Sequence, residues 1–98
     1  MGEILTFSNL LANPTTIKIL LVLLDTGQAY QFELVTKTGA HPSTIKVALK
    51  VLIDLKLVKI EVAERHVKNV GKFYGLTQHG KEVAEQLQTV ATLLERHR

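Results

Sequence analysis

The chain has 98 residues, of which 46% are hydrophobic, and a formal net charge of +3 at pH 7. This length suffices for one hydrophobic core and is too short for two, so we expect a single domain over residues 1–98. Cysteine is absent, which excludes disulfides, thiolate zinc sites and thiol redox chemistry. The longest apolar run covers six residues, 19–24, far short of a membrane span. No signal peptide is recognisable, and we expect a cytoplasmic protein.

The positive charge is concentrated in the middle of the sequence. Residues 1–36 carry a net charge of −2, residues 37–72 carry +5 and residues 73–98 are neutral. A local surplus of this kind is typical of proteins that bind a polyanion. An acidic protein surface or an anionic lipid could use the same patch, but neither accounts for where the surplus lies.

Two helices are predicted at the N-terminal end. Apolar residues at helical spacing predict a segment over residues 1–12, and Asn13 with Pro14 then favours the start of a second helix that ends near Gly27. The predicted core stripe of this second helix comprises Ile17, Leu20, Leu21 and Leu24. Further apolar residues lie on its other faces, so we expect a second layer to cover it, either the N-terminal helix or a partner chain.

The next predicted elements are a short strand over residues 29–31 and a brief helix that ends at Gly39. A longer helix follows, over residues 42–57, because His41 suits the N-cap and Pro42 the first helical position. Its predicted core face comprises Ile45, Ala48, Leu49 and Leu52. Its opposite face carries Ser43, Lys46, Val47, Lys50 and Asp54. Two ammonium groups, a hydroxyl and a small apolar side chain in the first two turns suit phosphates and base edges. The alternative is an ordinary solvated helix surface.

A strand pair with a basic loop is predicted after this helix. Val58, Ile60 and Val62 alternate with polar or small residues, which indicates a half-buried strand. Residues 64–72 are polar and contain turn-forming residues, and residues 73–76 return as a second strand. The basic side chains of the loop could lie along phosphates or enter a minor groove. The alternative is a solvated hairpin tip.

A last helix is predicted from Thr77, the expected N-cap, toward the C-terminus. Val83, Leu87, Val90 and Leu94 are spaced 4, 3 and 4 residues apart, as in the apolar seam of a coiled coil. Such a seam either pairs with its twin across a dimer axis or folds back on its own domain. We favour dimerisation because the helix is longer than a three-helix core can cover.

These segments resemble a known family. The sequence G-A-H-P-S-T-I-K-V-A-L-K-V-L-I-D-L-K-L-V at residues 39–58, preceded by N-P-T-T-I-K-I-L-L-V-L-L and followed by Y-G-L-T-Q-H-G-K, is similar to winged-helix transcriptional regulators of the MarR, ArsR and PadR type. The resemblance covers roughly residues 13–90. It implies an α+β, mostly α, winged helix-turn-helix with an N-terminal segment (1–12), a three-helix core with a two-stranded wing (13–76) and a C-terminal dimerisation helix (77–98).

The resemblance also implies a function. We expect a homodimeric transcriptional regulator that binds double-stranded DNA sequence-specifically, with residues 42–57 in the major groove and residues 64–72 on the backbone or minor groove. The residues expected to contact DNA are His41, Ser43, Thr44, Lys46, Val47, Lys50, Arg65, His66, Lys68 and Lys72, and those expected to form the dimer are Val83, Leu87, Val90 and Leu94. Two departures from the family pattern stand out. Lys56 replaces a frequent glycine, which puts the helix end in doubt, and the lack of cysteine puts metal sensing in doubt.

Catalysis, cofactors and metal sites find little support in the sequence. The four histidines are far apart and no catalytic motif occurs. Two alternatives to a regulator remain open: an architectural or partition-type protein that coats DNA with little sequence preference, and a winged-helix module that binds another protein. The operator, the sign of regulation and any small-molecule effector are not readable from the sequence. The composition suits an archaeal or viral source, and a DNA-binding protein would be associated with the nucleoid.

Overall fold

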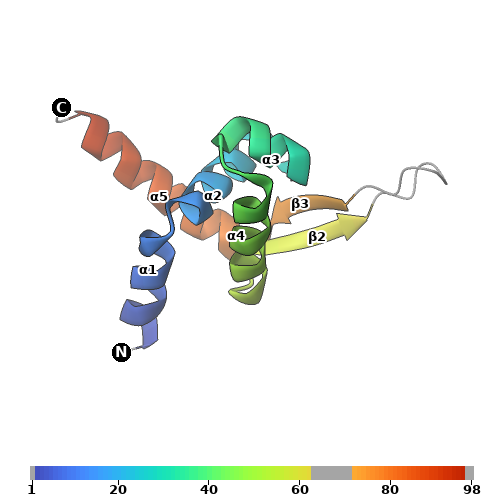
Figure 1. Ribbon diagram of the computed structural model, residues 1–98. Helices are drawn as coiled ribbons and strands as arrows, with labels where there is room; N and C mark the ends of the chain where they lie inside the picture. The colour runs from blue at the N-terminus through green and yellow to red at the C-terminus, as the bar shows by residue number, and fades with distance from the viewer. Residues whose placement is uncertain (1, 63–71, 97–98) are drawn as a thin grey trace.

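The computed structural model describes residues 2–62 and 72–96 (Figure 1). The elements in these ranges are α1 (Gly2–Ala12), α2 (Pro14–Thr26), β1 (Gln28–Tyr30), α3 (Gln31–Thr38), α4 (Pro42–Asp54), β2 (Val58–Val62), β3 (Lys72–Leu76) and α5 (Gln78–Arg96). This order confirms the predicted α+β, mostly helical, winged helix-turn-helix. The predicted strand at 29–31 begins one residue earlier, and the second wing strand begins at Lys72 rather than Phe73.

Helix α2 is the centre of the core, and its predicted core stripe is only partly correct: Leu20 is buried, and Leu24 packs against the core although it is half-buried. It begins as expected, since the Asn13 side chain accepts a hydrogen bond from the Thr15 N–H at 3.2 Å. Its fully buried residues, however, are Thr16, Ile19, Leu20 and Leu23, whereas Ile17, Leu21 and Leu24 are only half-buried. The helix is apolar on nearly every side, so periodicity does not single out one face. The buried face is decided by packing, because α1, α3, α4 and α5 all contact this helix.

Thr16 is the only buried polar side chain among the described residues. Its hydroxyl lies 3.0 Å from the carbonyl oxygen of Leu10 and 2.7 Å from that of Asn13. Because a buried hydroxyl is costly unless it is hydrogen-bonded, this pairing makes the position acceptable in the core. It also ties the end of α1 to the start of α2.

The strands form one antiparallel sheet in the order β1-β3-β2. The two wing strands, β2 and β3, are therefore extended by a third strand, β1, at the other edge of β3. β1 pairs with β3 from Gln28 opposite Gly75 to Tyr30 opposite Phe73. The rings of Tyr30 and Phe73 lie with their centroids 4.2 Å apart, a contact that strengthens a cross-strand pair. The predicted half-burial of β2 holds for Val58, which is buried, but not for Ile60, which is exposed, because only the start of the strand lies over the core.

The end of α4 differs from the prediction. The helix stops at Asp54 rather than near residue 57. The Leu57 N–H donates to the Leu52 carbonyl and the Lys56 N–H to the Ile53 carbonyl, both at 2.9 Å, which is the hydrogen-bond pair of a Schellman motif. The motif needs a left-handed residue, and Lys56 supplies it with φ of 62°. Glycine adopts this conformation at lower cost and is the residue from which a helix end is usually predicted. Because lysine stands here instead, the sequence does not indicate the end of α4.

Helix α5 begins at a close junction with the end of α4. The Thr77 hydroxyl donates to the Lys56 carbonyl at 2.7 Å and accepts from the Gly80 N–H at 2.9 Å, which confirms Thr77 as the N-cap. The Thr77 N–H donates to the Leu57 carbonyl at 3.1 Å. The first half of α5 packs on α2, and its second half extends away from the other elements (Figure 1).

Among the residues that the structure describes, no single helix is long and apolar enough to cross a membrane. Residues Ile4–Leu10 and Pro14–Thr26 reach the necessary length and composition only as a pair, across a bend of 85°.

Candidate nucleic-acid interface

Helix α4 has two sharply different faces, as predicted. Its inner face, formed by Ile45, Ala48, Leu49 and Leu52, is buried in the core. Its outer face is exposed at every predicted contact residue, namely Ser43, Thr44, Lys46, Val47 and Lys50. Since no described element covers these five side chains, the first two turns of α4 present two positive charges, two hydroxyls and one apolar group to solvent. This combination suits the phosphates and base edges of a nucleic acid.

The start of α4 is built by an unusual cap. The Nδ1 atom of His41 accepts a hydrogen bond from the Ser43 N–H at 3.1 Å and lies 2.8 Å from the Ser43 hydroxyl. An Nδ1 that accepts leaves the proton of the neutral ring on Nε2. Because His41 is exposed, that Nε2–H is free to donate to an external acceptor, beside the positive end of the helix dipole. The predicted contact residue therefore also orders the helix.

Phe32 is a residue that sequence reasoning missed. Its side chain in α3 is 75% exposed. Together with Gln31, Val35 and Pro42 it lines a shallow hollow between α3 and the start of α4. Phe32 thus adds an apolar group beside the outer face of α4. Phe32 and Leu34 are two positions apart and so lie on opposite sides of a helix, but this spacing does not tell which of the two is buried.

The wing is described only at its base. Lys72 begins β3, is exposed and pairs with Val62 in the strand register. The other predicted wing contacts, Arg65, His66 and Lys68, lie outside the described residues. On β2 the ammonium of Lys59 lies 3.3 Å from a carboxylate oxygen of Glu61. Both side chains of this ion pair are about half-exposed, so it adds little stability, but it offsets part of the local positive charge.

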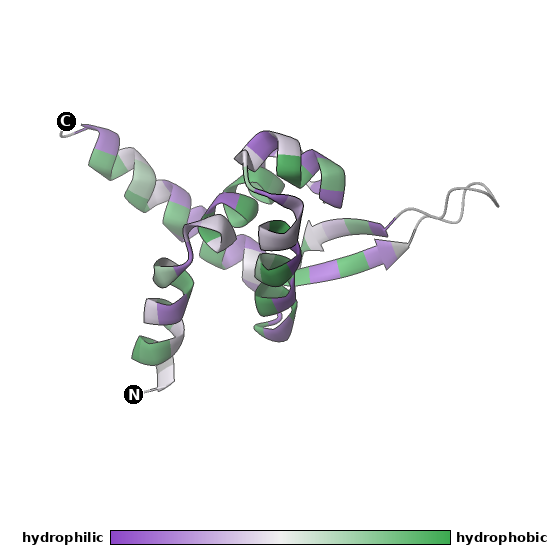
Figure 2. Cartoon of the chain, in the orientation of Figure 1, coloured by the Kyte–Doolittle hydropathy of each residue, from purple (hydrophilic) through white to green (hydrophobic). Residues whose placement is uncertain are grey.

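The predicted dimerisation residues divide into two groups. Val83 and Leu87 are half-buried and pack against the core of their own chain, whereas Val90 and Leu94 are exposed. The first half of the apolar seam therefore packs on its own domain, and the second half is exposed to solvent. Exposed apolar residues also occur on α1, namely Ile4, Leu5 and Phe7, and Figure 2 shows apolar residues along both helices. The residues expected to form a dimer lie on the C-terminal helix alone.

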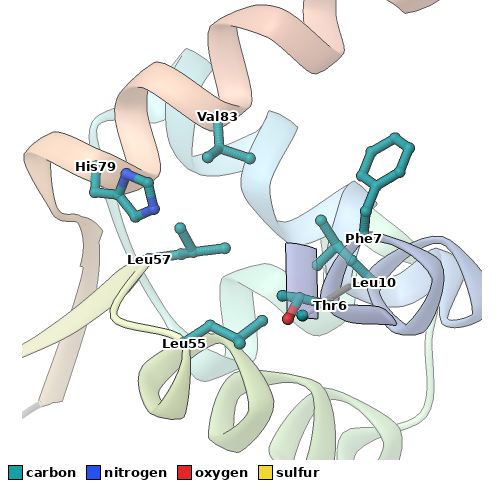
Figure 3. Close-up of a pocket in the computed structure, with 8 residues that line it drawn as sticks. Thr6, Phe7, Leu10, Leu55, Leu57, His79 and Val83 are labelled. Atoms are coloured by element: carbon teal, nitrogen blue, oxygen red, sulfur yellow. The ribbon is translucent and has the colours of Figure 1, made fainter. Parts of the chain in front are cut away.

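An apolar groove lies between α1 and α5, and Figure 3 shows the residues that line its first hollow. It consists of two hollows of about 490 and 400 Å³ that share Phe7, His79 and Val83. Leu55 and Leu57, from the turn after α4, form part of the wall of the first hollow. Both hollows are open to solvent and lined mainly by apolar atoms. Among the described residues, no three histidine or acidic side chains come together in a way that could hold a metal ion.

Solved structures of transcription regulators have the same fold as this chain. No family model matches the sequence, and no curated protein is significantly similar to it. The transcriptional regulator homologue protein of Pyrococcus horikoshii is 20% identical, with a TM-score of 0.74, over 99% of this chain and 97% of that chain. A PadR family transcription regulator of Clostridium difficile is 22% identical, with a TM-score of 0.71, over 84% and 91%.

A MepR-like protein crystallised with pseudoligands is 29% identical, with a TM-score of 0.67, over 78% of this chain. The match covers 52% of that protein, so this chain spans about half its length. These similarities concern the fold. The chain therefore has the winged helix-turn-helix fold of the PadR- and MarR-type transcription regulators.

Proposed function

We propose that this protein is a homodimeric transcription regulator that binds double-stranded DNA, with α4 in the major groove and the wing on the backbone or minor groove. The observation that carries the proposal is the outer face of α4, where Lys46, Val47 and Lys50 are all exposed on a helix whose inner face is anchored in the core. A rigid helix with such a face can enter a groove without rearrangement.

The charge distribution supports the same proposal. Residues 37–72, which contain α4 and the wing, carry a net charge of +5 in a chain whose total is +3. Lysines that neutralise phosphates release counterions, so this segment would supply affinity that does not depend on sequence. The exposed Nε2–H of His41 adds a donor for a phosphate at the start of α4. Base contacts from Ser43, Thr44 and Val47 would then provide the preference for one site.

The exposed apolar residues support a homodimer. Of ten large hydrophobic side chains that are exposed in the described residues, six lie on α1 and α5: Ile4, Leu5, Phe7, Val90, Leu93 and Leu94. A monomer rarely leaves so concentrated an apolar surface in water. We propose that a second copy covers it and fills the groove between these helices, which would place two α4 helices on one DNA duplex.

The test is fluorescence-anisotropy binding to duplex from the region upstream of the protein's own gene and to a scrambled duplex, each at several salt concentrations. We expect a preference above about a thousandfold for the upstream site. Replacing Lys46 and Lys50 together by glutamine should weaken binding to both duplexes and lower the slope of log affinity against log salt by about two. Lys18→Gln, an exposed lysine on α2, is the control and should change neither.

Other outcomes would point elsewhere. Equal affinity for both duplexes with a steep salt slope would favour an architectural or partition-type protein. Absence of binding even at low salt would contradict the DNA proposal and favour a protein-binding module.

A further inference from the structure

Val47 is the least expected residue on the outer face of α4. Its side chain is 61% exposed, and it does not belong to the apolar residues that pack against the core. At 3.6 residues per turn it points almost directly away from the buried stripe. Ser43 lies one turn before it and Lys50 one turn after it. Val47 is thus an apolar group at the centre of a polar face.

The fold offers no reason for a valine at this position. A β-branched side chain is a poorer helix former than lysine, glutamate or alanine, and an exposed apolar group gains no burial. Lys46 and Lys50 flank Val47. An apolar protein surface that covered Val47 would also have to desolvate these two ammonium groups, which is costly. The same charges favour the phosphates on both sides of a DNA groove.

In the major groove, thymine alone among the four ordinary bases presents a methyl group, at C5. We propose that Val47 packs on the C5-methyl group of a thymine and so determines one position of the recognised sequence. The inference rests on the proposed function and deepens it, because it names the chemical group that this helix reads. Lys46 and Lys50 hold the helix in the groove, and Val47 selects.

The experiment removes one methyl group from the DNA. The tightest duplex is selected from a randomised pool, and each thymine is replaced in turn by deoxyuridine, which differs only in lacking that methyl. We expect one thymine in each half-site where this replacement weakens binding by about fourfold, the value of burying one methyl group. Elsewhere the replacement should have little effect.

The variant Val47→Ser links the effect to this residue. It removes both methyl groups of the side chain with little change in helix propensity, and a thermal melt confirms that the fold is kept. At the sensitive position the fourfold ratio between thymine and deoxyuridine should fall to about one. Lys46→Gln, on the same face, is the matched control: it should weaken binding to both duplexes and leave their ratio unchanged.

The outcomes separate this inference from the proposal on which it rests. Tight, selective binding with no thymine sensitive to deoxyuridine, or a ratio that survives in Val47→Ser, overturns the inference and leaves the regulator intact. Binding without selectivity overturns the inference because no base is read. No binding to any duplex overturns both.

Discussion

Gly80 is the described glycine with the least room for a side chain. A Cβ atom built at this position would lie 1.8 Å from the carbonyl oxygen of Leu57 and 2.7 Å from its carbonyl carbon. Both are backbone atoms, so no side-chain rotation can relieve the clash. The first turn of α5 therefore rests directly on the backbone that follows α4, and only glycine permits this approach.

Replacing Gly80 by alanine should therefore destabilise the fold by about 3 kcal/mol, near the upper end of the range for overpacking. Urea denaturation followed by far-UV circular dichroism measures the change. Gly75→Ala is the control, since a Cβ there would meet its nearest atom at an ordinary 3.5 Å, and it should have a much smaller effect. An unchanged denaturation midpoint for Gly80→Ala would show that the junction is looser than described.

Helix α5 packs on the core in its first half and is proposed to form the dimer with its second, and the boundary between the two halves determines how dimerisation can be tested. Leu87 is a poor probe, because it packs against the core and a charge there would also destabilise the fold. Leu94 is 67% exposed and lies in the half of the helix that extends away from the core. A charge at Leu94 would be solvated in a monomer and buried in a dimer.

We therefore expect Leu94→Asp to convert the dimer to a monomer without loss of helical content, because an unpaired carboxylate is costly in an apolar interface. Sedimentation equilibrium gives the mass, and far-UV circular dichroism checks the fold. Thr92→Asp, which adds the same charge on the opposite, exposed side of the helix, should remain dimeric. A dimer that persists in Leu94→Asp would place the interface away from the end of α5.

The elements also differ in how well the sequence predicts them. Helix α4 is predicted well on both faces, because the His41 cap, Pro42 and the apolar period all agree. The fully buried face of α2 is predicted correctly only at Leu20, because apolar residues surround the helix and only its neighbours decide which side is inside. The end of α4 at Asp54 is not predicted, because Lys56 adopts the left-handed conformation that glycine usually adopts after a helix.

The candidate site follows the same logic. The exposure of Lys46, Val47 and Lys50 follows from helical periodicity, which is local information. The exposure of Phe32 depends on how α3 meets α4, and the contribution of α1 to the apolar surface depends on where α1 lies relative to α5. Neither relation is encoded in the spacing of residues along one element.

In the whole molecule, α4 and α5 are held as one body. The hydrogen bonds between Thr77 and the Lys56–Leu57 backbone, at 2.7 and 3.1 Å, join the end of one helix to the start of the other. If α5 forms the dimer axis as proposed, the separation of the two α4 helices is set by this junction. The two half-sites on DNA should then be one helical turn apart, about 10 base pairs between centres.

Inserting five base pairs between the half-sites turns one of them to the opposite side of the duplex. We expect the affinity to fall by at least about a hundredfold, since only one subunit can then bind. Anisotropy on the original and extended duplexes measures this. An extension of ten base pairs, which restores the rotation but doubles the distance, should not recover the loss. Equal affinity for the original and extended duplexes would indicate that the subunits bind independently.

The position of β3 in the sheet has a consequence for biosynthesis. β3 is the last strand to be made, yet it lies in the middle, between β1 and β2. A nascent chain that ends before residue 72 holds β1 without its strand partner, and it lacks Tyr74 and Ala84, which are buried in the finished core. Helices α2–α4 are therefore synthesised before the elements that complete the cover of their apolar faces. Synthesis proceeds at roughly 5–20 residues per second, which sets how long these faces stay incompletely covered. Completion of the fold waits for residues 72–84, so a slow stretch of codons placed just before β3 would prolong the interval in which the nascent protein is open to aggregation and proteolysis.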